Sequence, residues 1–184
     1  MRPDVRDDPR FRLMPFALGD RSGPAEIIVP ARNSGAATLS GTFFRSLGRN
    51  AEGGSSTETV EVRRIDDLGL PPARFWKIDT EGTELDVLKG AARTLAATPP
   101  VAIQVEIFPN DPARYGETLR LIGGLFPHFW AVGISETGRP GIYDVTPERV
   151  SDPQFHAALV RTGTPRYFAS ARPAREWVEE ARDA

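Results

Sequence analysis

The chain has no cysteine, only two histidines and no long apolar run. Without cysteine, disulfides, a thiolate nucleophile and Cys-ligated zinc or iron–sulfur sites are excluded. His128 and His156 lack the spacing of a His-based metal site or a Ser-His triad, so we expect both in loops or on the surface. No segment approaches the roughly 20 apolar residues that a membrane span needs, and the first residues do not resemble a signal peptide. We therefore expect a cytoplasmic protein without a membrane span.

The chain also lacks an excess of positive charge. Its formal net charge is −2 at pH 7, whereas nucleic-acid binding needs a dense basic face. With 184 residues, 40% of them hydrophobic, the chain can form one core. We predict a single domain over residues 1–184, with a charged, proline-rich tail at 1–10 and a C-terminal extension at 135–184.

The N-terminal part predicts short strands separated by turns. Strands are expected at 11–18 and 25–29, followed by a long loop over 30–57 that holds at most one weak strand. Loops of that length in compact domains are usually functional or mobile. Residues 59–65 alternate apolar and polar side chains, which is typical of a half-exposed edge strand.

The central part has the most regular pattern. A strand at 75–79 precedes a helix at 84–97 that we expect to begin with a capping box of Thr83 and Asp86. The nearly continuous apolar run at 101–108 favours a strand covered on both faces. The remaining expected elements are a helix at 113–126, strands at 129–134 and 166–169, and a final surface helix at 175–183. Alternating strands and helices predict an α/β fold with a doubly wound sheet.

An acidic turn follows the strand at 75–79, where α/β sheets bind ligands. It holds four carboxylates within eight residues. Helix starts favour carboxylates because of the helix dipole. The cap alone accounts for Thr83 and Asp86, and Glu84 is consistent with a solvated residue of the first turn. Asp79 and Glu81 are as consistent with contacting a ligand as with a purely structural role. Gly82 indicates that the backbone makes a sharp turn or lets another group approach it closely. Lys77 lies two positions before Asp79, so a structural ion pair is an equal alternative. The carboxylates of the turn are Asp79, Glu81, Glu84 and Asp86.

The sequence resembles the FkbM family of S-adenosylmethionine-dependent methyltransferases. The resemblance rests on Ala17-Leu18-Gly19-Asp20, on Val62-Arg63-Arg64-Ile65-Asp66-Asp67-Leu68, and above all on the segment from Lys77 to Ala91. That segment, KIDTEGTELDVLKGA, is similar to the family signature at nearly every position, and Val105-Glu106-Ile107 is similar to the acidic strand that follows it. The resemblance covers residues 11–134.

The resemblance implies a Rossmann-like enzyme that transfers a methyl group from S-adenosylmethionine to a hydroxyl of a sugar, glycan or secondary metabolite. It implies that Gly19 and Asp20 lie near the donor adenine and that Asp79 and Glu81 act in catalysis. It also implies that Gly82, Glu84 and Glu106 border the acceptor. It implies no metal.

The sequence departs from the family in lacking the Gly-rich strand-to-helix turn that cradles the donor and the strand after it. Three explanations are open: the sequence is part of a longer protein, the domain is a non-catalytic remnant that no longer binds donor, or the fold is completed by another chain. A sheet without those strands would expose an apolar edge, which predicts self-association. A further alternative is a divalent-metal site formed by Asp79, Glu81 and Glu106.

Overall fold

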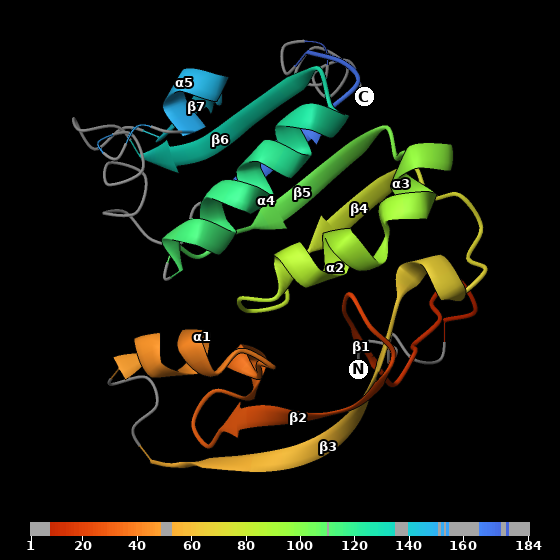
Figure 1. Cartoon of the computed structure of the whole chain (residues 1–184), viewed down its shortest axis with the longest axis vertical. Coiled ribbons are helices and arrows are strands. Elements are labelled where there is room, and N and C mark those ends of the chain that lie inside the picture. The colour runs from red at the N-terminus through yellow and green to blue at the C-terminus, as the bar shows by residue number, and fades with distance from the viewer. Residues whose placement is uncertain are drawn as a thin grey trace.

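The computed structural model of the chain describes residues 8–48, 53–109, 111–134, 140–150, 152, 154, 166–173 and 176. It shows a mixed α/β fold with a five-stranded sheet and a smaller three-stranded sheet. Helices lie over one face of the larger sheet, and the smaller sheet lies along the side of its outer strand Phe75–Ile78 (Figure 1).

The strands are β1 (Ala17–Leu18), β2 (Gly23–Pro30), β3 (Ser55–Arg63), β4 (Phe75–Ile78), β5 (Ala102–Glu106), β6 (His128–Ile134), β7 (Pro140–Asp144) and β8 (Arg166–Ser170). The helices are α1 (Gly41–Ser46), α2 (Glu84–Gly90), α3 (Ala92–Ala97), α4 (Pro112–Leu125) and α5 (Pro147–Val150), with short 3₁₀ turns η2 (Ser34–Ala36) and η4 (Ile65–Asp67).

The smaller sheet has the order β1-β3-β2. β3 pairs with β1 in parallel and with β2 in antiparallel register, so the prediction of an edge strand at 59–65 is wrong. The predicted strand at 11–18 is paired only at Ala17 and Leu18. Phe11 and Leu13 are instead exposed, because none of the described strands pairs with the segment before Ala17, and Pro15 has no N–H for such pairing.

The segment 30–57, predicted as a loop, contains a helix. Ser40 caps α1 by accepting a hydrogen bond from the amide of Phe43 at 3.1 Å. Phe43 is 3% exposed. The helix has only six residues, too few for its apolar periodicity to stand out in the sequence.

The larger sheet has the order β4-β5-β8-β6-β7. The parallel pair β4–β5 is followed by β8, which runs antiparallel to both β5 and β6. Ile103 and Val105 of β5 are buried, while the other three residues of the strand are half-buried. The expectation of a strand fully covered on both faces is therefore not met over the described residues, since α2, α3 and α4 lie on one face (Figure 1).

The core lies between this face and the helices. Its most buried side chains are Val87, Leu88, Ile103, Val105, Leu119, Ile122 and Tyr167. Three aromatic side chains of the larger sheet and its connections differ in burial: Trp130 is buried, Trp76 packs against the core, and Phe108 is half-buried.

β4 is an outer strand of this sheet over the described residues. Beside it lies a cavity of about 300 Å³ with a mainly apolar lining that includes Leu18, Ile65, Leu70 and Phe75. Phe75 is 54% exposed. The exposed apolar edge expected from the sequence is thus present, whereas self-association itself stays a prediction. The described helices include none long and apolar enough to cross a membrane.

The predicted helix at 84–97 is divided at Ala91 into α2 and α3. The break frees the backbone amides of Arg93 and Thr94, and the carboxylate of Asp66 accepts a hydrogen bond from each, at 3.1 and 2.9 Å. The Thr94 hydroxyl donates to the same carboxylate. Asp66 therefore caps α3 from outside the helix.

Replacing Asp66 by alanine should lower the free energy of unfolding by about 1–2 kcal/mol, the usual effect of losing an N-cap. Burial alone would raise the pKa of Asp66, but the hydrogen bonds from Thr94, Arg93 and Arg64 outweigh it and lower the pKa to about 2. Because the pKa is lowered on folding, this stabilisation is present above the ordinary value of 3.8 and is lost as the pH falls through about 2.

Urea unfolding of Asp66→Ala and Asp67→Ala at pH 7 and pH 2 measures this effect. The Asp67 carboxylate is half-exposed and should matter little. Equal stability of the two variants at pH 7 would show that Asp66 does not act as a cap.

Candidate functional site

The turn at residues 79–83 joins the carboxyl end of β4 to α2 and is held by Glu84. The Glu84 Oε1 atom accepts hydrogen bonds from the amides of Thr80 and Gly82, at 3.1 and 3.0 Å, and from the Thr80 hydroxyl at 3.3 Å. Glu84 is 4% exposed, and burial raises its pKa despite these hydrogen bonds. The predicted capping box does not form: the Thr83 hydroxyl donates to the Thr80 carbonyl, and Asp86 pairs with Arg114 at 2.7 Å.

Glu81 has an uncommon backbone conformation, with φ at 55°. Among the described residues it is the one non-glycine residue with positive φ, a conformation that usually costs 1–2 kcal/mol. Its carbonyl accepts a 2.7 Å hydrogen bond from the Thr38 hydroxyl, which comes from the segment before α1. Strained residues of this kind are concentrated at functional sites.

The pKa of Glu81 is raised to about 7. Burial is the largest cause, and the negative charges of Asp79, Glu84 and Glu106 add to it, while Lys77 opposes it. A carboxylate with a pKa near 7 changes protonation at physiological pH, which suits a group that accepts a proton during a reaction.

Two of the neighbouring carboxylates have cationic partners. Asp79 pairs with Lys77 at 2.5 Å, as the spacing of the two residues suggested. Glu106 pairs at 2.5 Å with Arg166, its register partner on β8. The structure thus brings together the predicted Asp79, Glu81, Gly82, Glu84 and Glu106 at one end of β4 and β5.

Gly82 makes the close approach that the sequence indicated. Its φ is 98°, and a Cβ at this position would lie 2.7 Å from the Cβ of Phe43. Phe43 belongs to α1, so this helix lies directly against the turn. Sequence reasoning missed Thr38 and Phe43, because their partners in the turn, Glu81 and Gly82, are more than 35 positions away along the chain.

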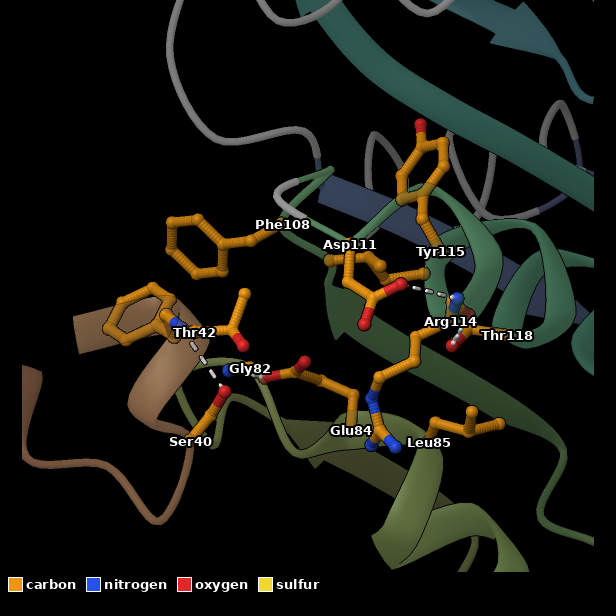
Figure 2. A pocket seen from close by; sticks show the side chains of 12 residues that line it. Ser40, Thr42, Gly82, Glu84, Leu85, Phe108, Asp111, Arg114, Tyr115 and Thr118 are labelled. Carbon is orange, nitrogen blue, oxygen red and sulfur yellow. Dashed lines mark hydrogen bonds between the residues drawn. The ribbon is translucent and has the colours of Figure 1, made fainter. Parts of the chain in front are cut away.

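A pocket of about 50 Å³ opens where α1, the turn and the start of α4 meet (Figure 2). One wall is aromatic: Phe43 and Phe108 lie edge to face with ring centroids 4.6 Å apart. Opposite lies the first turn of α4, capped by Asp111, whose carboxylate accepts from the amide of Arg114 at 3.2 Å. The other lining residues are Ser40, Thr42, Gly82, Glu84, Leu85, Ile107, Tyr115 and Thr118.

The structure does not place Gly19 and Asp20 with the carboxylates. Gly19 donates its amide to the carbonyl of Arg63 and packs against Gly90, where a Cβ would overlap the Gly19 carbonyl oxygen. Gly90 is the last residue of α2, and the acidic turn lies at the opposite end of this helix, about 10 Å away by helix geometry. Asp20 is exposed, so its side chain remains accessible to a ligand.

The alternative of a metal site gains no support, since the described residues include no group of three or more His, Cys, Asp or Glu side chains placed to hold a metal ion. His128 begins β6, at the opposite end of the sheet from the carboxylates, because β6 runs parallel to β5. His156 lies outside the described residues, as do residues 175 and 177–183 of the predicted final helix.

Comparison with protein families gives one finding. A family model described as Methyltransferase FkbM domain matches residues 2–128, which include β1 to β5, the acidic turn and α4. No curated protein and no solved structure matches the chain.

Gly82→Ala should destabilise the fold by about 1–3 kcal/mol. The new methyl group must displace Phe43, and the alanine must adopt a backbone conformation with positive φ that its side chain disfavours. Gly124→Ala is the matched control: it lies in α4 with open space around it and should be neutral or slightly stabilising. Thermal unfolding of both variants tests this. A Gly82→Ala protein as stable as wild type would show that α1 does not pack on the turn.

Proposed function

Because the chain belongs to the methyltransferase FkbM domain family, which indicates methyltransferase activity, we propose that it transfers a methyl group from S-adenosylmethionine to a hydroxyl oxygen. The acceptor class we propose is a sugar, a glycan or another small hydroxyl-bearing metabolite. A cytoplasmic location, proposed from the sequence, goes with this function.

The observation that supports the proposal most is the state of Glu81. Its strained backbone, its half-buried side chain and a pKa of about 7 make it the described carboxylate best suited to take the proton of an acceptor hydroxyl. We assign it that role. Asp79 lies beside Glu81 and provides a second carboxylate at the site, whose negative charge is balanced by the ion pair with Lys77.

The carboxylates also fit the donor's charge. S-adenosylmethionine, when bound, supplies a methyl group on a positively charged sulfonium. Burial is the largest cause of the raised pKa of Glu81, and the charges of Asp79, Glu84 and Glu106 add to it against that of Lys77. The charges around Glu81 are therefore mainly negative, which favours a cation. We propose that Asp20, with its exposed side chain, contacts the adenosine portion, and that Gly19 holds Asp20 in place through its packing on Gly90.

Glu81→Gln should lower the rate of methyl transfer by 10²- to 10⁴-fold, the usual contribution of a general base. The wild-type rate should rise with pH and level off above about 7, because only the ionised carboxylate accepts a proton. Transfer of radiolabelled methyl groups to a panel of glycosides measures both effects.

Glu58→Gln is the control for this substitution, because Glu58 is exposed on β3, away from the turn. Its rate should equal that of wild type. A Glu81→Gln protein that retains the wild-type rate and pH profile would remove Glu81 from the mechanism.

The second candidate function is a domain that no longer binds the donor. It is favoured by the separation of Gly19 from the acidic turn and by the outer position of β4. Titration calorimetry of S-adenosylmethionine into the 184-residue chain, with circular dichroism of the same sample, separates the two. Saturable binding supports the enzyme, and a folded sample without binding supports the second candidate.

A further inference from the structure

The pocket in Figure 2 lies next to Glu81 but does not include it. Its residues come from α1, from the turn after β4, from the end of β5 and from α4. The volume, about 50 Å³, holds only a few non-hydrogen atoms. The pocket is therefore suited to one small substituent rather than to a whole sugar ring or nucleoside.

The polar groups of the pocket are mainly acceptors. Figure 2 shows the carboxylates of Glu84 and Asp111 facing the same space, with Thr42 on the other side. Glu84 is 96% buried, as its 4% exposure shows, so its charge is poorly screened by water. An anionic group would be repelled here, whereas a group that donates hydrogen bonds would be favoured.

The Arg114 cation and the hydroxyls of Tyr115 and Thr118 are engaged elsewhere, while the hydroxyls of Ser40 and Thr42 accept hydrogen bonds from Phe43 and Arg45. The Arg114 guanidinium pairs with Asp86 at 2.7 Å and runs beneath the pocket. The Thr118 hydroxyl donates to the Arg114 carbonyl, and the Tyr115 hydroxyl bonds that of Tyr167 on the side away from the pocket. The two carboxylates thus determine which polar group can bind.

The aromatic wall selects for carbon beside that polar group. Phe43 and Phe108 lie edge to face, and such a wall offers apolar contact to C–H groups. Combined with the carboxylates, it favours a short carbon unit that ends in a hydroxyl.

We propose that this pocket is the acceptor subsite, and that it binds a neutral substituent of hydroxymethyl size on the acceptor, whose hydroxyl donates its one proton to the carboxylate of Glu84 or Asp111. This inference rests on the proposed methyltransferase function. It makes α1 and the start of α4 the elements that determine acceptor specificity.

Saturation-transfer NMR of the 184-residue chain tests the inference with three probes: methyl β-D-glucopyranoside, methyl β-D-xylopyranoside, which lacks the hydroxymethyl group, and methyl β-D-glucopyranosiduronate, which carries a carboxylate there. We expect transfer to the hydroxymethyl protons of the glucoside, and at least threefold weaker transfer to the other two probes. Equal transfer to all three would overturn the proposal.

Three variants locate the binding. Thr42→Phe places a ring at the pocket mouth and should abolish saturation transfer to the glucoside. Thr57→Phe, the same change at an exposed position on β3, should leave this saturation transfer intact. Asp111→Asn keeps an N-cap for α4 and should weaken glucoside binding severalfold without changing the melting temperature. Unchanged saturation transfer to the glucoside in Thr42→Phe would overturn the proposal.

Failure of this inference can be distinguished from failure of the proposed function. Methyl transfer that persists in Thr42→Phe at the wild-type rate and selectivity would leave the enzyme proposal intact and overturn the subsite. Probe binding in a chain that does not bind S-adenosylmethionine would support the pocket as a binding site and overturn the methyltransferase proposal.

Discussion

The geometry of the candidate site depends on one buried carboxylate. The Glu84 Oε1 atom accepts hydrogen bonds from the amides of Thr80 and Gly82. A carboxylate that is almost fully buried is tolerated only with such hydrogen-bond partners. These hydrogen bonds turn the backbone inward around the carboxylate. The residue between the two amides, Glu81, is consequently held in a conformation that its side chain would otherwise disfavour.

The smaller sheet and its connections hold α2 at both ends. At the amino end, Thr38 donates to the Glu81 carbonyl and Phe43 covers Gly82. At the carboxyl end, Gly19 lies against Gly90 with no room for a side chain between their backbones. Asp66 then caps the helix that follows. The acidic turn therefore depends on residues from the first third of the chain as much as on its own sequence.

This dependence accounts for what could be predicted from the sequence. The strand–helix–strand order, the start of α2 at Glu84, the Lys77–Asp79 pair and the close approach at Gly82 all follow from local patterns. The cap of α3 by Asp66 and the role of α1 do not, because the residues that pair lie far apart in the sequence. The capping box was a wrong prediction for the same reason: Arg114, 28 positions away, binds Asp86.

The position of β8 has a consequence for how the chain folds during synthesis. β5 and β6 are not neighbours, and the strand that joins them is Arg166–Ser170. Until residue 170 has left the ribosome, the larger sheet consists of two separate halves, β4–β5 and β6–β7, each with an open inner edge. The sheet therefore closes last at its centre, and this late, long-range step should be the slow one in its formation.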